Sequence, residues 1–324
     1  MLKTIFQKIV GISPTIEVLF RKLYWRNIKL MHRFKPKTSI TSKKNAPVSF
    51  DHILESLKNQ GVGNGDLIIV HSSFKALKPT NLSPDQIIDA LIKFIGEEGT
   101  LAMPVFRRFE EEPTVYDILN TNLQEVICTY NVEKSPIWTG ILPITLSKRE
   151  KSVVSQCPIN PLSAIGKFSK PMMENNIKGN RILPHGENSC WKFCLDKHAI
   201  IVGIGIDLAH SLTMLRAYEE CNLPTWPVKD WYDERQYKII NSDFEASVKV
   251  LDRKQFWGMY YLPQIKMRKD LLKNNILKSY LVEGIPVETV NSHELFLYFD
   301  KKNKKQKGYP YLIPKRYRNN KHDL

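Results

Sequence analysis

The stretch from residue 199 to residue 220, AIIVGIGIDLAHSLTMLRAYEE, decides the fold of this chain. Its first half is a short apolar run rich in β-branched residues and closed by glycines, which predicts a buried strand. Its second half places Leu215 and Glu219 at helical spacing, so a strand feeds a helix through a polar turn. Ligands often bind at such turns in open α/β sheets. The turn therefore predicts either a ligand site or a plain helix cap by Asp207 or Ser211.

The composition predicts a partner that carries negative charge. The 324 residues are 42% hydrophobic, enough for one large α/β domain or two small ones, and 48 Lys and Arg face 33 Asp and Glu for a formal charge of +15. This balance favours nucleic acid, an acidic membrane surface or a phosphorylated small molecule, and it disfavours a polycationic substrate unless the pocket is locally acidic. Basic residues gather at the two ends of the chain and do not interleave with aromatic residues on one domain, so we expect no nucleic-acid interface.

The five cysteines predict reduced thiols and no metal site. They are odd in number and scattered, with no signal peptide before them. Cys190 and Cys194 lie four residues apart, but no second Cys/His pair at zinc-ligand spacing accompanies them. No apolar run approaches the roughly 18 residues that span a bilayer. We therefore expect a cytoplasmic protein, either soluble or peripheral to the inner face of the membrane.

The two ends of the chain differ from its middle. Residues 1–46 form a basic amphipathic arm in which eleven Lys or Arg face one acid, Glu17, and Pro14 divides the arm. This arm either lies on an anionic membrane or packs against its own domain or another subunit. Residues 301–324 form a basic tail, which we expect to be solvated.

Residues 47–300 alternate predicted helices with buried strands, which indicates an α/β sandwich. Ser135 and Pro136 predict the start of a helix through Arg149, interrupted by Pro143, and the turn-rich residues 155–167 predict entry into another helix. The C-terminal part is β-rich before a last helix. The expected helices are 51–60, 83–96 and 292–299, and the expected strands are 65–74, 99–106, 199–206, 236–240, 246–251 and 277–282.

Six short motifs, in order, resemble the aminoglycoside 3-N-acetyltransferase superfamily of acyl-CoA-dependent N-acyltransferases. The resemblance covers roughly residues 49–221 and implies a central mixed β-sheet sandwiched by helices, with an acyl-CoA, acetyl-CoA for example, as co-substrate and no metal. The motifs are GDxxxVHSS from Gly65, GTLxMP from Gly99, SPxxxG from Ser135, SxCP from Ser155 followed by Gly166, GxxS from Gly186, and the strand-turn-helix of residues 199–220.

The resemblance also implies where the ligands lie. Strand ends and neighbouring loops would line the channel for the pantetheine arm and the acyl thioester, and the helix after the glycine-closed strand would carry a histidine base three residues before a glutamate. Such a histidine can take the proton that an ammonium must lose before its nitrogen attacks a thioester. The implied channel residues are His71, Ser72, Ser73, Phe74, Met103, Pro104, Ser135, Pro136, Cys157, Gly186 and Ser189.

The chain departs from the family pattern at the base itself. Aligning Thr213 and Glu219 with the family puts Arg216 at the histidine position, and the ungapped alignment from Asp207 puts Thr213 there. A guanidinium stays protonated and cannot act as a base. Cys157 likewise replaces the histidine of the family's Ser-x-His-Pro segment.

Three interpretations of this departure remain open. His210 could reach the site from the turn and act as the base. A substrate amine of low pKa could attack without a base, while Arg216 binds a phosphate. The chain could also be a degenerate relative that acts as a binding or scaffold protein.

Charge guides the choice of acceptor. Aminoglycosides carry several ammonium groups and need an acidic pocket, whereas nucleoside-diphosphate sugars and CoA are polyanionic. The sequence therefore predicts transfer of an acetyl or short acyl group to an amino sugar, nucleotide-linked and destined for a surface polysaccharide. The alternative is an aminoglycoside 3-N-acetyltransferase of the antibiotic-resistance type.

Overall fold

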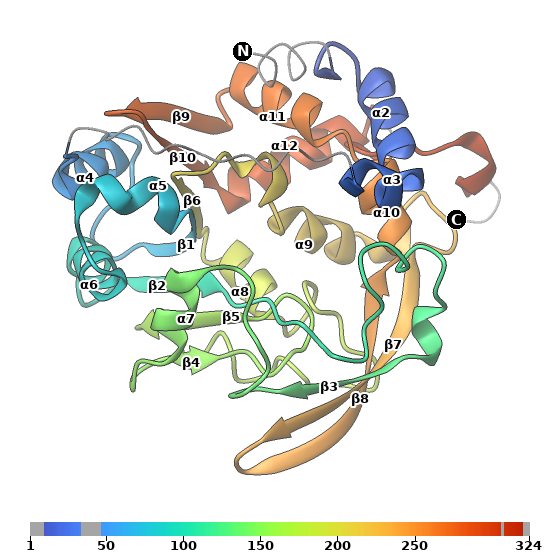
Figure 1. Cartoon of the computed structure of the whole chain (residues 1–324), viewed down its shortest axis with the longest axis horizontal. Coiled ribbons are helices and arrows are strands. Elements are labelled where there is room, and N and C mark those ends of the chain that lie inside the picture. The colour runs from blue at the N-terminus through green and yellow to red at the C-terminus, as the bar shows by residue number, and fades with distance from the viewer. Residues whose placement is uncertain (1–9, 34–46, 306–307, 320–324) are drawn as a thin grey trace.

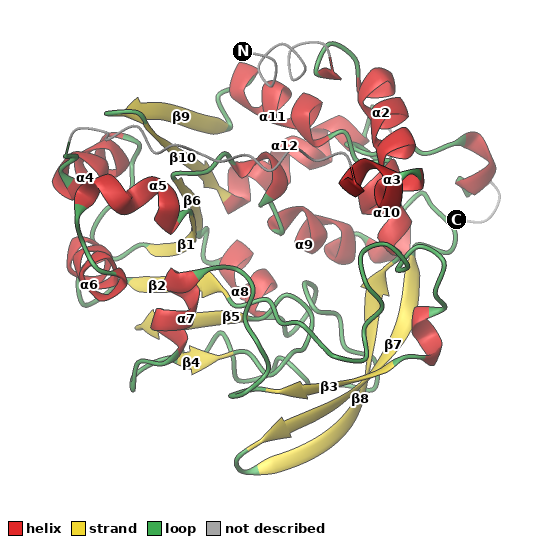
Figure 2. Cartoon of the chain, viewed as in Figure 1, coloured by secondary structure: helices red, strands yellow, loops and turns green. Residues whose placement is uncertain are grey.

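A seven-stranded mixed sheet runs through the centre of the molecule (Figures 1 and 2). The structure is a computed structural model that describes residues 10–33, 47–305 and 308–319. Three neighbouring strands at the middle of the sheet are parallel, and antiparallel strands flank them on both sides. In spatial order the strands are β4 (Val153–Val154), β5 (Leu162–Gly166), β2 (Thr100–Pro104), β1 (Leu67–Ser72), β6 (Ile200–Ile204), β10 (Ile285–Asn291) and β9 (Leu277–Val282).

Helices cover both faces of this sheet because alternate residues of its strands point to opposite sides. Ile68 and Val70 of β1 belong to one hydrophobic cluster, and Leu67 and Ile69 belong to the other. The first cluster is covered by α4 (Phe50–Asn59), α6 (Pro84–Ile95) and α7 (Ile141–Ser147), with α5 (Phe74–Leu77) beside it. The second is covered by α8 (Cys190–Asp196), α9 (Met214–Cys221), α11 (Gln264–Lys273) and α12 (Ser292–Asn303).

A second, smaller sheet confirms the expected β-rich part of the chain. A long hairpin of β7 (Tyr232–Asn241) and β8 (Phe244–Arg253) pairs with β3 (Ile127–Asn131), which runs parallel to β7. The short helix α10 (Gln255–Tyr260) follows the hairpin. Short 3₁₀ turns lie between these elements and near the end of the described residues: η1 (Lys78–Thr80), η2 (Leu123–Glu125), η3 (Leu208–His210), η4 (Leu223–Thr225) and η5 (Lys315–Tyr317).

The described part of the N-terminal arm packs against its own domain. It forms α2 (Pro14–Arg26) and α3 (Ile28–Arg33), and Ser13 caps α2 by accepting from the amide of Thr15. Pro14 therefore begins a helix, as prolines often do at the first position. Helix α2 lies against α10 and α11. Residues 1–9 and 34–46 of the arm lie outside the described residues, and no helix within those that are described is long and apolar enough to cross a bilayer.

Three predictions of local structure are wrong, each because of a long-range contact. The helix expected from Pro136 begins only at Ile141, since residues 136–138 pair with residues 106–108. The segment 155–167 leads into strand β5, which pairs with β2, and not into a helix. The tail is not fully solvated, because α12 continues to Asn303 and Tyr309, Tyr311 and Ile313 are buried.

Candidate active site

The carboxyl ends of β1 and β6 meet at one edge of the sheet, as parallel neighbours must. His71 and Ser72 pair in register with Gly203 and Ile204, and the amide of Ser73 donates to the carbonyl of Ile204 at 3.0 Å. Gly205 follows with a φ of +75°, and a Cβ there would lie 2.6 Å from the Cβ of Ala76. Only glycine fits this close approach, so the His-Ser-Ser segment and the turn after β6 form one unit, the strand-tip site.

His71 brings an unpartnered nitrogen to this site. Its Nε2 is buried and has no hydrogen-bond partner among the described residues. Burial lowers the pKa of His71 to about 4, so the imidazole is neutral at physiological pH. Buried polar atoms are almost always satisfied, and a neutral imidazole nitrogen can meet a polar atom of a ligand.

A pocket of about 680 Å³ opens beside the strand tips, and His210 lies on its wall. The Nδ1 of His210 is 2.8 Å from Oε1 of Gln264, which also accepts from Nη1 of Arg21 at 3.0 Å. Asp207 accepts from the amide of Ala209, so it caps the 3₁₀ turn η3. The expected cap of the following helix by Asp207 or Ser211 is wrong, because Thr213 is the N-cap residue of α9. The pocket is lined by Gly205, Ile206, Asp207, His210, Ser211, Arg268, Ser279, Tyr280, Leu281, Pro286 and Glu288.

The strand-tip pocket is locally acidic although the chain is strongly basic. Asp207 is exposed at its wall, and Glu288 is fully buried, where it accepts from Leu208, Ser279 and Arg268. Glu288 is compensated by Arg268, so Asp207 is the one exposed carboxylate without an ion-pair partner among the residues that line the pocket. The pocket wall therefore carries a local negative charge, against a formal charge of +15 for the whole chain, and this favours a cationic group.

The residues of α9 do not form a base and acid pair. Nη1 of Arg216 donates to Oδ1 of Asp252 at 2.8 Å. Glu219 is 1% exposed and accepts from Arg253 at 3.1 Å and from the Tyr311 hydroxyl at 2.5 Å. Each side chain therefore has its own partner from another element. Thr213 precedes α9, and its side chain makes no capping hydrogen bond.

Five other residues with a predicted ligand role lie at or near the ends of β1 and β2. The carbonyl of Pro104 accepts from the Thr139 hydroxyl at 2.6 Å, and the hydroxyl of Ser135 accepts from the amide of Asn131. Ser135 and Pro136 line a basic cavity of about 800 Å³ whose wall includes Arg107, Lys134 and Lys148. Met103 is completely buried in the core under α6 and α7, and Phe74 packs against that core.

The last three predicted ligand residues have structural partners in this fold. Cys157 is buried in the core of the smaller sheet, and burial raises the pKa of its thiol. The hydroxyl of Ser189 caps α8 by accepting from the amide of Lys192 at 3.0 Å. A Cβ on Gly186 would lie 2.9 Å from the Cβ of Leu183. Their ligand role stays a prediction.

Sequence reasoning missed a buried histidine-carboxylate pair next to α9. Nδ1 of His185 is 2.7 Å from Oε1 of Glu220, whose Oε2 accepts from the amide of His185 at 2.7 Å. Nε2 of His185 is 2.9 Å from Nδ2 of Asn160. Burial lowers the pKa of His185 and raises that of Glu220. Both side chains are enclosed, so the pair fixes α9 against the loop before α8. The sequence offered one signal for this pair, which is that His185 stands directly before Gly186 of the GxxS motif.

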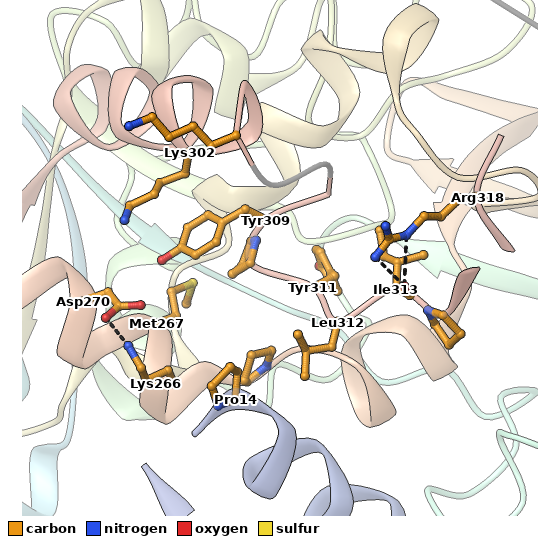
Figure 3. Close-up of a pocket in the computed structure, with 14 residues that line it drawn as sticks. Pro14, Lys266, Met267, Asp270, Lys302, Tyr309, Tyr311, Leu312, Ile313 and Arg318 are labelled. Carbon is orange, nitrogen blue, oxygen red and sulfur yellow. Dashed lines mark hydrogen bonds and ion pairs between the residues drawn. The ribbon is translucent and has the colours of Figure 1, made fainter. Parts of the chain in front are cut away.

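Another cavity, of about 780 Å³, lies between α11, α12 and residues 309–318 (Figure 3). Lys266, Lys302, Lys305 and Arg318 line it, and Lys266 pairs with Asp270. None of the residues with a predicted ligand role line this cavity. It is therefore separate from the strand-tip site.

The fold and the site define an α/β protein whose candidate ligand site lies at the tips of parallel strands. The family model described as aminoglycoside 3-N-acetyltransferase matches residues 69–301. The chain belongs to this family, whose members are N-acyltransferases. The aminoglycoside N(3)-acetyltransferase IV of Salmonella sp is 38% identical over 61 residues, a match that spans 19% of this chain and 23% of that relative.

Solved structures of aminoglycoside acetyltransferases share the fold. AAC(3)-Xa superposes with a TM-score of 0.65 at 17% identity, over 81% of this chain and 94% of that one. AAC-IIIb, in a binary complex with CoASH, gives 0.66 at 16% identity, over 83% and 100%. A variant of AAC(3)-IVa in complex with a gentamicin gives 0.61 at 18% identity, over 80% and 90%. These likenesses confirm the mixed α/β architecture that the resemblance implied.

Proposed function

We propose that this chain transfers an acetyl group from acetyl-CoA to an amino group of an aminoglycoside or a closely related amino sugar. The family match supports the reaction class, and related structures are described with CoASH and with gentamicin. The observation that carries the choice of acceptor is the local acidity of the strand-tip pocket. The comparisons lend no support to a nucleotide-linked sugar of a polysaccharide pathway, and the positive charge of the whole chain, which favoured such a sugar, does not extend to this pocket.

The residues at the strand tips fit the acyl end of the co-substrate. His71 offers its unpartnered Nε2, and the half-buried Ser72 and Ser73 offer hydroxyls beside it. The basic cavity at Ser135 suits the phosphates of CoA, because the exposed Lys134 and Lys148 lie on its wall. Acetyl-CoA supplies an activated acyl group, and the residues at the strand tips hold that group in place.

His210 is the base in this proposal, and its tautomer follows from its neighbours. Arg21 donates to Oε1 of Gln264, which fixes the amide with its oxygen toward His210. Nδ1 of His210 then carries the hydrogen and donates to that oxygen, which leaves the lone pair on Nε2. An ammonium entering the pocket can pass its proton to Nε2 and become nucleophilic. Arg216 instead pairs with Asp252, so phosphate binding by its guanidinium would require breaking that ion pair.

The test is CoA release from acetyl-CoA, followed with a thiol reagent, for a panel of acceptors. The panel contains several aminoglycosides, simple amino sugars and nucleotide-linked amino sugars. We expect CoA release that depends on an aminoglycoside or simple amino sugar. Release only with nucleotide-linked sugars would contradict the acceptor class, and CoA binding without transfer to any acceptor would favour the degenerate relative.

A further inference from the structure

Helix α2 is fixed to the domain by two charged side chains on one of its faces. The carboxylate of Glu17 accepts from the amides of Ile265 and Lys266, both at 2.8 Å, at the start of α11. Arg21 donates to the carbonyls of Gly258 and Met259 at 2.7 and 3.0 Å. A carboxylate at a helix N-terminus and a cation at the end of α10 both match the helix dipoles. These contacts fix which face of α2 points outward.

The outward face is apolar. Leu19 and Leu23 of α2 are 58% and 52% exposed, and Leu30 and Met31 of the following helix α3 are 51% and 46% exposed. Ile12, before α2, is 68% exposed. We call these five residues the outer face. Helix α2 packs on α10 and α11, α3 contacts α2, and both lie on the outside of the molecule (Figure 1), so the outer face is at the molecular surface.

The charge around the outer face is positive. The described residues 10–33 contain five Lys or Arg and one acid, and that acid, Glu17, is 1% exposed because it caps α11. The arm therefore offers no carboxylate of its own to the outside. Arg26 is exposed near Leu23, and Lys29, although paired with Asp117, is 69% exposed.

We propose that the outer face docks on an anionic lipid surface. Exposed leucines on a helix that lies flat can enter the boundary between headgroups and acyl chains, and neighbouring Lys and Arg are attracted to anionic headgroups. The contacts of Glu17 and Arg21 keep the helix parallel to the surface of the domain, so docking needs no unfolding of the arm. The residues that line the strand-tip pocket lie on other elements, and α2 reaches that pocket only through the contact of Arg21 with Gln264, so the outer face is not part of it.

The test is co-sedimentation of the full chain with vesicles. One set is phosphatidylcholine alone, and the other contains phosphatidylglycerol in addition. The test variant is Leu19→Glu with Leu23→Glu. The matched control is Leu297→Glu, because Leu297 is a helical leucine of α12 with 53% exposure. Thermal unfolding and acetyl transfer in solution, measured for every variant, report whether the fold is intact.

We expect the wild type and Leu297→Glu to sediment with anionic vesicles, and to do so less at high salt. The double variant should bind about tenfold more weakly, with unchanged unfolding and catalysis. Equal sedimentation of the double variant and the wild type would overturn the proposal. So would absence of wild-type binding to anionic vesicles, binding to a soluble polyanion only, or self-association of the wild type that the double variant lacks, without any vesicle binding.

Discussion

His210 is the residue on which the proposed chemistry depends, because its Nε2 is left with a lone pair beside the acidic wall of the strand-tip pocket. We expect His210→Gln to lower kcat by ~10²–10⁴-fold, since glutamine cannot take the proton from the amine. The KM for acetyl-CoA should change little. Steady-state kinetics with an accepted aminoglycoside measure both constants.

The control for this variant is His293→Gln, at the start of α12, where the ring of His293 stacks on that of His198. It should keep the wild-type kcat. An unchanged kcat in His210→Gln would remove the base from the mechanism and favour attack by an amine that is already neutral.

His71 makes the stability of the fold sensitive to acid. Its pKa is about 4 in the folded chain against an ordinary value of 6.5. Between these two values the unfolded state binds more protons than the folded state, so stability falls as the pH falls through this window. We expect the wild type to lose about 2 kcal/mol more than His71→Gln between about pH 7 and pH 4.5. Urea unfolding of both proteins at the two pH values measures this difference, and equal losses would contradict it.

Helix α9 is held to the hairpin of β7 and β8 by buried charges. Arg216 pairs with Asp252, which also faces Arg235 at 3.6 Å, and Arg253 pairs with Glu219. Removing one partner of a buried pair leaves a charge without compensation. We expect Arg216→Ala to reduce the free energy of unfolding by about 3 kcal/mol. Chemical denaturation checks this. A stable variant whose only defect is a raised KM for the acceptor would instead support phosphate binding by Arg216.

Elements with local signals could be predicted from the sequence. Ser83 and Pro84 predict the start of α6, and the structure shows a full capping box formed by Ser83 and Gln86. The apolar run before His71 gives β1, as expected. In contrast, Ser135 and Pro136 look like a helix start but follow a strand and pair with residues 106–108. A contact between segments distant in sequence leaves no local signal, so the elements that depend on such contacts cannot be predicted from local sequence patterns.

At the scale of the whole molecule, some parts of the site follow from the order of the strands, and other parts depend on contacts between residues distant in sequence. Parallel pairing of β1 and β6 brings His71 and the turn at Asp207 together, and that arrangement follows from strand order. The His185–Glu220 pair and the ion pairs of α9 depend on contacts between residues 34 to 36 positions apart. The burial of Tyr311 against Glu219, 92 positions away, turns an expected tail into part of the core.

The central claim is that the tips of β1 and β6 hold the reacting end of acetyl-CoA beside the acceptor pocket. The most direct measurement is an experimental structure of the full chain with CoA bound. The account predicts that the sulfur of CoA lies beside His71 and Ser73, on the side of the site that faces His210. A sulfur bound in the cavity of Figure 3, between α11 and α12, or among the buried charges around Glu219, would contradict the account.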